Sequence, residues 1–386
     1  MENIVFYIHR TGLLSYYINP ICEYLSKNYR IIVLHLDKCN GYHYAPEKSS
    51  LYDTIDLSGK SAKSIECLLK ELKPKALVNL GFISIYELLM LRICKTLGIK
   101  TIFLEHGLYS KETSSLPFRK MIHNFGPTVK KNLNFLSLYL QFIIMSKNSK
   151  YELSVFWRCF RKKEYYVSKF DRALFFADYG YQKISDFFHY KNNEVDFICY
   201  PLANTNREFS HYEEIAKLPH NNDGKATFIH QPFILDGLAN WSYDDEKTYV
   251  LELANRLKQY GYELSVQLHP REDIDRYKKL YQGTGVDIIY GMNRVDFKKY
   301  SLVVGCYSTA LLYPIFFKIP VIIVDYPDVF EAKGSLFYPV SCSLPIKEEE
   351  ILVSQYDEFC NEYLGTGNCS FENIALKIEE TLQTFS

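Results

Sequence analysis

The cysteines of this 386-residue sequence form no C-x-x-C pair, and neither sign of charge is in excess. Ten cysteines are scattered along the chain, several in apolar runs, which is typical of reduced, packed thiols rather than a zinc or disulfide framework. The 45 basic residues balance 45 acidic ones, whereas nucleic-acid-binding proteins carry a marked basic excess. The composition therefore predicts a cytoplasmic protein with no nucleic-acid partner.

Long hydrophobic segments are also missing. The first residues, MENIVFYIHRTG, lack the basic and apolar regions of a secretory signal. The longest nearly apolar run, Leu133–Met145, is too short to span a bilayer. Apolar residues nevertheless make up 47% of the chain, and its length exceeds that of one ordinary core, so we expect two domains.

Several nucleotide-binding motifs are absent. Without G-x-x-x-x-G-K-[ST] the chain is not a P-loop ATPase, and the lack of G-x-G-x-x-G argues against a dinucleotide-dependent dehydrogenase. No D-x-D motif stands at the end of a predicted strand, where metal-dependent sugar transferases hold Mg²⁺ or Mn²⁺. We therefore expect neither a metal nor a cofactor.

Predicted strands and helices alternate along both halves of the chain. In the first half the strands are 4–8, 29–36, 76–80, 100–104, 172–177 and 195–200, and the helices are 15–28, 60–72, 85–97 and 181–188. In the second half the strands are 226–230, 263–268, 286–289, 302–305 and 321–324, and the helices are 245–260, 273–281, 309–317 and 347–386. The alternation predicts an α/β fold of two doubly wound, Rossmann-like domains facing a central cleft.

The domain boundary is expected in the polar stretch 203–224, which separates domains at 1–202 and 225–386. The first domain should contain a helical insertion at 117–172, which departs from the alternating pattern.

The sequence EHG follows directly on the predicted strand 100–104. Ligands of open parallel sheets bind beyond the carboxyl ends of the strands, so these residues are candidates for an active site. Glu105 would serve as a general base, and Gly107 would permit a tight turn with close backbone approach. Alternatively, the carboxylate caps the next helix and His106 stands beside it by chance.

Two further motifs end strands of the second domain. His230 and Gln231, in IHQPF, are candidates to bind a nucleotide or phosphate, although Pro232 is equally consistent with a plain turn. In LHPRE, His269 offers a hydrogen bond to a phosphate and Pro270 fixes the turn.

The residues that follow Pro270 add charge. Arg271 would clamp a phosphate or carboxylate, and Glu272 would accept hydrogen bonds from ribose hydroxyls or hold Arg271.

A third strand end in this domain, Gly305, precedes a predicted helix that begins near Thr309. Ser308 is a suitable N-cap, and the free N–H groups of a helix N-terminus attract anions. Gly305, Ser308 and Thr309 are therefore candidates to bind a phosphate, and plain capping uses the same groups.

The ordered motifs EHG, HPRE and ST resemble those of bacterial sialyltransferases and polysialyltransferases of GT-B fold. By this resemblance Glu105 matches the acidic base and Gly107 its glycine, while His269-Pro270 matches the motif that binds the CMP part of the donor. Ser308-Thr309 matches the hydroxyl pair on the phosphate.

The resemblance implies an inverting, metal-independent glycosyltransferase. Its donor would be a CMP-sugar carrying a sialic or related nonulosonic acid. Its acceptor would be a glycan or lipid-linked glycan of lipopolysaccharide, O-antigen or capsule.

One departure from the sialyltransferase pattern keeps alternatives open. His106 stands where that family has a second acid, and His106-Gly107 followed by Lys111 is similar to teichoic-acid-type CDP-glycerol or CDP-ribitol phosphotransferases, in which His106 would be the base. The acids that flank their serine pair are absent, since Cys306 and Tyr313 stand there. CMP-Kdo transferases of capsule synthesis share the skeleton, and a non-catalytic nucleotide- or glycan-binding protein is a further alternative.

The segment 117–172 carries twelve Lys or Arg against three Asp or Glu, interleaved with aromatic residues such as Phe135, Phe142, Phe156 and Trp157. Basic clusters with aromatic side chains bind the anionic surface of the inner membrane, where a lipid-linked acceptor would lie. The segment thus predicts a peripheral location on that membrane, the alternative being a helical insertion whose charges are merely solvated.

Overall fold

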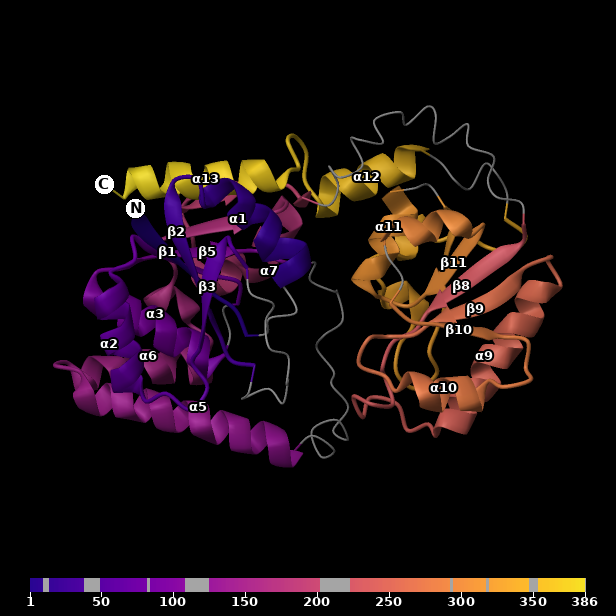
Figure 1. Cartoon of the computed structure of the whole chain (residues 1–386), viewed down its shortest axis with the longest axis horizontal. Coiled ribbons are helices and arrows are strands. Elements are labelled where there is room, and N and C mark those ends of the chain that lie inside the picture. Colours follow the sequence, from indigo (N-terminus) through magenta and orange to yellow (C-terminus); the bar gives the residue numbers. More distant parts are fainter. Residues whose placement is uncertain are drawn as a thin grey trace. The chain divides into compact units, whose positions relative to one another are not determined.

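The computed structural model describes residues 1–9, 14–37, 49–81, 84–107, 125–201, 223–291, 294–316, 319–346 and 353–385. They fold into two compact units (Figure 1). The first takes its described residues from Met1–Gly107, Pro127–Asn204 and Asn361–Ser386, and the second takes almost all of its residues from Thr205–Cys360. The segment after 360 therefore differs from the prediction, which placed it in the second domain.

The first unit is built on a parallel sheet of seven strands in the order β3-β2-β1-β4-β5-β6-β7. The strands are β1 Glu2–Tyr7, β2 Tyr29–His35, β3 Tyr52–Asp56, β4 Ala76–Asn79, β5 Lys100–Leu104, β6 Arg172–Phe175 and β7 Val195–Phe197. The prediction missed β3, an edge strand that pairs only with β2 and leaves Asp53 and Thr54 exposed. The strand order reverses direction between β1 and β4, which is where ligands of doubly wound sheets bind.

Helices cover both faces of this sheet. They are α1 Asn19–Leu25, α2 Ala62–Leu72, α3 Ile85–Leu97, α5 Phe125–Met145, α6 Ser149–Lys162, α7 Asp178–Phe188 and α13 Phe371–Thr384. In α3 every residue from Tyr86 to Cys94 is buried, because α5 and α6 form a further layer over it. The predicted insertion is therefore part of the core of this unit, and Phe135 and Phe142 are buried within it.

The C-terminal segment packs on α1 (Figure 1). The rings of Tyr17 and Phe371 lie 6.0 Å apart, and Asn28 Nδ2 donates to Glu379 Oε1 at 2.9 Å. A disulfide joins Cys199 to Cys369, whose Cα atoms are 4.8 Å apart. The expectation that all cysteines are reduced is wrong at this pair, because sequence spacing does not reveal that the chain returns to the first unit.

The second unit is a parallel sheet of five strands in the order β10-β9-β8-β11-β12. The strands are β8 Lys225–Ile229, β9 Glu263–Gln267, β10 Asp287–Ile289, β11 Leu302–Gly305 and β12 Val321–Ile323. The helices are α9 Tyr243–Lys258, α10 Ile274–Leu280, α11 Leu312–Phe316 and α12 Val353–Tyr363, the last of which runs into the first unit. The order reverses between β8 and β11, so this unit has its own position for a ligand.

These sheets confirm the predicted α/β fold with two doubly wound units. None of the helices in the described part of the chain is both long and apolar enough to cross a membrane. Most of the predicted linker, the segment 117–124 and Lys111 lie outside the described residues.

Candidate active site

Polar residues of the first unit gather at the carboxyl ends of its central strands. His9 follows β1, and Glu105 and His106 follow β5. His9 Nε2 lies 3.1 Å from Oε1 of Glu87, which stands in the first turn of α3. Glu87 also accepts from the backbone N–H of Ser84 in the capping box of α3. A contact between a histidine and a carboxylate therefore stands at the point where the strand order reverses.

His106 is partly exposed beside this pair. Burial lowers the pKa of His106 below its usual value, although a hydrogen bond with the backbone of Leu80 and the charge of Glu87 oppose the shift. The imidazole is consequently neutral at pH 7 and can accept a proton.

Glu105 is only 1% exposed. Its carboxylate accepts a hydrogen bond of 2.6 Å from the backbone N–H of Phe176, and a Cβ at Gly180 in α7 would overlap it. Burial raises the pKa of Glu105 to about 8, against the opposing effect of the Phe176 bond. The carboxyl group thus points into the first turn of α7, and its role as the base stays a prediction.

Gly107 meets no requirement for glycine that the structure shows. A Cβ there would have no atom within 4 Å, and its φ is outside the left-handed region. No contact within the protein therefore requires glycine at this position, and a close approach of the Gly107 backbone to a bound ligand stays a prediction.

The second unit holds a buried polar cluster around Glu246 of α9. One carboxylate oxygen, Oε1, accepts from Tyr326 at 2.7 Å and lies 3.0 Å from Nε2 of His230, and Tyr277 donates to the other oxygen at 2.6 Å. Burial acts to raise the pKa of Glu246, but the bonds from His230, Tyr277 and Tyr326 outweigh it and leave that pKa below its usual value. Glu246 is therefore a charged anchor inside the unit.

This anchor determines which nitrogen of His230 carries a proton. In a neutral imidazole the nitrogen that faces the carboxylate, Nε2, holds the hydrogen, and Nδ1 is then an acceptor. Nδ1 is buried and has no hydrogen-bond partner among the described residues. His230 follows β8 at the point of strand reversal, so an acceptor is available where a nucleotide would bind.

His269 stands at the end of the adjacent strand, β9. Its Nδ1 accepts from the backbone N–H of Arg271 at 3.2 Å, which leaves the hydrogen on Nε2. Burial, together with the charge of Arg271, lowers the pKa of His269 to about 4, while Asp236 acts in the opposite direction. His269 is therefore a neutral hydrogen-bond donor at pH 7.

The other residues of HPRE are engaged within the unit. Arg271 makes two bonds of 2.7 Å to the carboxylate of Asp236, and the carbonyl of Pro270 accepts from Tyr290 at 3.0 Å. Glu272 is buried, and its Oε1 has no hydrogen-bond partner among the described residues. Burial raises the pKa of Glu272, although the charges of Arg276 and Arg271 oppose the shift.

The remaining predicted donor-binding residues have simple surroundings. Gln231 is buried, and its backbone carbonyl accepts from Phe233 N–H at 2.8 Å. Ser308 caps the turn that follows β11 by accepting from Ala310 N–H at 3.3 Å, and Thr309 is exposed at its start. The predicted helix at 309–317 begins as a 3₁₀ turn, Thr309–Leu311, before α11.

Gly305 has a packing role. A Cβ on this residue would stand 3.0 Å from the side chain of Leu311.

Carboxylates suited to a metal do not gather in the part of the chain that the structure describes. Asp273 and Asp275 have D-x-D spacing, but Asp273 caps α10 by accepting from the backbone N–H groups of Asp275 and Arg276. The expectation of a metal-independent reaction stays a prediction.

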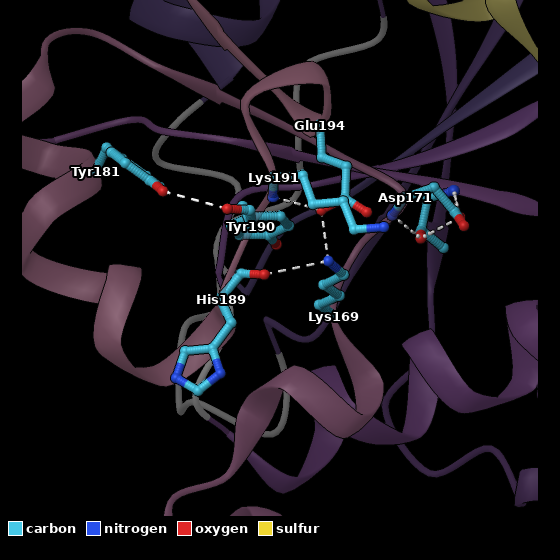
Figure 2. A network of polar contacts seen from close by, with 8 residues as sticks. Lys169, Asp171, Tyr181, His189, Tyr190, Lys191 and Glu194 are labelled. Atoms are coloured by element: carbon cyan, nitrogen blue, oxygen red, sulfur yellow. Dashed lines mark hydrogen bonds and ion pairs between the residues drawn. The ribbon is translucent and has the colours of Figure 1, made fainter.

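A separate polar network lies at the amino ends of β5, β6 and β7 (Figure 2). Lys169 pairs with Glu194 and donates to the carbonyl of His189 at 3.3 Å, and Asp171 accepts from Thr101 at 2.7 Å. The network lies at the amino ends of these strands, whereas Glu105 and His106 follow the carboxyl end of β5. We therefore interpret the network as stabilising the first residues of the three strands.

Sequence reasoning missed His9, Glu87, Glu246, Tyr277 and Tyr326. One of them had a usable signal. Glu246 occupies the buried face of α9 with Val250 and Leu257, at spacings of four and seven residues. A carboxylate on an otherwise apolar helix face predicts a buried partner. The two tyrosines come from distant segments and carry no local signal.

No protein-family model and no curated protein matches the sequence. Solved structures match the whole fold. The UDP-GlcNAc 2-epimerase of Neisseria meningitidis, bound to UDP-GlcNAc, has a TM-score of 0.50 at 12% identity, with 100% of both chains covered. The wall teichoic acid polymerase TagF, a histidine-to-asparagine variant soaked with CDPG, has a TM-score of 0.54 at 14% identity, covering 99% of this chain and 89% of that one.

A UDP-glucosyltransferase from Polygonum tinctorium has a TM-score of 0.50 at 12% identity, covering 100% of this chain and 98% of that one. Together with the two parallel sheets, these matches define the class: the chain has the GT-B fold of glycosyltransferases.

Proposed function

We propose that the chain is a transferase that moves a group from a cytidine-activated donor to a hydroxyl of a surface-glycan acceptor. The first candidate donor is a CMP-activated sialic or related nonulosonic acid. The observation that carries the proposal is the neutral His269 at the end of β9, whose Nε2–H is held as a donor by the Arg271 N–H bond to Nδ1.

In the proposed reaction His269 donates this hydrogen bond to the donor phosphate as negative charge develops on it. Ser308 and Thr309 would add hydroxyl contacts to the same phosphate. His230, held by Glu246, would offer Nδ1 as an acceptor to the nucleotide. A departing CMP carries one phosphate, so protein donors suffice in this proposal and no metal takes part.

The acceptor hydroxyl must lose a proton to a base. His106 suits this role better than Glu105, because His106 is partly exposed and neutral while the Glu105 carboxyl group is buried against α7. We therefore assign the proton acceptor to His106, and we assign Glu105 to holding the turn between β6 and α7 through its bond from Phe176 N–H.

The second candidate is transfer of glycerol phosphate or ribitol phosphate from a CDP-linked donor. The accessible His106 favours it, since the similarity to the teichoic-acid enzymes places a histidine at this position. The fold match with the TagF variant soaked with CDPG supports the same alternative.

Binding and turnover separate the candidates. Isothermal titration should show binding of CMP in preference to UMP, and release of CMP from CMP-Neu5Ac or from CDP-glycerol in the presence of a glycan acceptor identifies the donor. His269→Ala should reduce turnover by ~100-fold or more, because it removes a preorganised donor to developing charge.

The matched control is His189→Asn, at an exposed histidine with φ of 47°, a conformation that asparagine tolerates. Equal binding of all nucleotides, or full turnover in His269→Ala, would contradict the proposal.

A further inference from the structure

The outer layer of the first unit, formed by α5 and α6, has one face in the core and one in solvent. Phe135 of α5 packs on Tyr86 with ring centroids 5.0 Å apart, and Glu152 of α6 forms a bidentate ion pair with Arg92 at 2.8 Å. Both contacts are to α3, which lies beneath (Figure 1). The opposite sides of α5 and α6 therefore point away from the unit.

These outward sides expose an unusual share of large apolar side chains. Of fifteen such exposed side chains in the described part of the chain, seven lie on α5 and α6. On α5, Leu133, Leu140 and Ile144 follow one another at seven and four residues, which places them on one helix face. Ile144 is 80% exposed. This concentration of exposed apolar side chains indicates a surface that binds another molecule or a membrane.

Helix α6 continues the pattern with charge added. Lys150, Leu153, Trp157 and Arg161 recur at intervals of three or four residues, and all four are exposed. Trp157 is 57% exposed and Leu153 is 52% exposed. Apolar side chains in the middle of this stripe are thus flanked by a cation at each end.

The charge of this layer has one sign. Residues 131–163 include seven Lys or Arg and a single acid, Glu152, which is buried with Arg92. Among the described residues, Lys147, Lys150, Arg161, Lys162 and Lys163 have no acidic side chain within ion-pair distance. The whole chain has no net charge, so the excess is a local property of this layer.

We propose that this outer basic face, defined by Leu133, Leu140, Ile144, Lys150, Leu153, Trp157, Arg161 and Lys162, binds an anionic phospholipid surface. Interfacial helices combine Trp and Leu at the acyl boundary with Lys and Arg at anionic headgroups. A second copy of the chain is a poor occupant, because it would bring like charges together. The face binds lipid whether or not the proposed transfer takes place; only its use in reaching a lipid-linked acceptor rests on the proposed function.

The chain offers a direct reporter, since it has two tryptophans, Trp157 and Trp241. Trp241→Phe leaves Trp157 as the only one. Adding vesicles of phosphatidylglycerol and phosphatidylcholine at low salt should shift its fluorescence to the blue, whereas pure phosphatidylcholine vesicles should not. Raising the salt to 0.5 M should reverse much of the shift, because screening weakens attraction between exposed charges.

Two sets of substitutions test the chemistry by co-sedimentation with the anionic vesicles. Replacing Arg161, Lys162 and Lys163 with Glu should weaken binding on the order of 100-fold, given the contribution of each basic side chain near an anionic surface. Leu153→Ser with Trp157→Ser should weaken it with little change in salt dependence. Lys258→Glu with Tyr260→Ser, a similar pair of exposed positions on the second unit, should bind like the unaltered protein.

Three results would overturn the proposal: no binding of the unaltered protein to anionic vesicles, equal binding to neutral vesicles, or self-association that Trp157→Ser abolishes without any lipid binding. His269→Ala protein should bind vesicles fully, which separates the failure of this proposal from failure of the proposed transferase activity.

Discussion

At the scale of single residues, the two candidate bases differ in their protonation. A base must be unprotonated to act, so the acid limb of kcat/KM reports its pKa in the free enzyme. The pKa of His106 is lowered from its ordinary value of 6.5, whereas burial raises the pKa of Glu105 to about 8.

If His106 is the base, kcat/KM should stay constant as the pH falls from 8 to about 6.5 and decline only below that. If Glu105 is the base, the decline should begin near pH 8. The pH profile of CMP release with the preferred donor distinguishes them.

The assignment of His106 as the base also predicts which of two substitutions lowers the activity more. His106→Asn should lower kcat by on the order of 100-fold or more, the usual contribution of a general base, with little change in the unfolding free energy. Glu105→Gln should retain more activity and unfold at pH 7 much like the unaltered protein, because a carboxyl group with a pKa of about 8 is already largely protonated and the amide oxygen can accept from the Phe176 N–H in its place. Measuring kcat and urea unfolding for both variants tests this, and the reverse order would restore Glu105 as the base.

The Glu246 cluster allows a matched comparison of two tyrosines. Tyr277 donates to the buried carboxylate, whereas the buried Tyr281 hydroxyl has no partner among the described residues. Tyr277→Phe should lower the unfolding free energy by ~1.5–3 kcal/mol, the value of a hydrogen bond to a charged group, and should weaken CMP binding. Tyr281→Phe should change neither. Urea unfolding and titration with CMP measure both effects, and equal behaviour of the two variants would remove Glu246 from the binding machinery.

Residues that end strands could be predicted from the sequence, because a strand and the turn after it are local. His230, His269 and Ser308 were located in this way. Their chemical states could not be predicted, since the proton position on His230 depends on Glu246, and that of His269 on a backbone N–H in a folded turn.

At the scale of elements, the buried strands carried the clearest sequence pattern, and the polar edge strand β3 carried almost none. The layer of α5 and α6 shows what amino-acid composition alone cannot predict. Its basic residues and its apolar residues were visible, but which aromatic rings lie inward depends on packing against α3. Phe135 and Phe142 are buried there, while Trp157 is exposed.

The ion pair between Arg92 of α3 and Glu152 of α6 fastens this layer to the unit. Arg92→Met should lower the unfolding free energy by ~3–5 kcal/mol, because it leaves the carboxylate of Glu152 buried without its cation. Combining it with Glu152→Leu should recover much of the loss, since no unpaired charge then remains. Urea unfolding of the single and double variants tests this, and an equally large loss in both would show that packing, rather than charge, is what matters.

At the scale of the whole molecule, the sequence predicted two doubly wound units but not the path of the chain between them. The helical period of 347–386 identifies helices without saying which sheet they cover. In the structure α13 packs on α1 of the first unit, and a disulfide joins Cys199 to Cys369 in the same unit. Two cysteines 170 residues apart have no detectable relation in the sequence, which is why the disulfide was not predicted.

The disulfide allows a test of whether the C-terminal segment belongs to the first unit. Protein purified without reductant and then denatured should titrate eight free thiols of its ten cysteines, and reduction should expose all ten. Closing a loop of 170 residues lowers the entropy of the unfolded chain, an effect of ~5 kcal/mol in the chain-entropy model, so Cys369→Ser should lower the Tm. Cys67→Ser, at an exposed free cysteine, is the control and should leave the Tm unchanged. Ten free thiols before reduction would show that the C-terminal segment is held by packing on α1 alone.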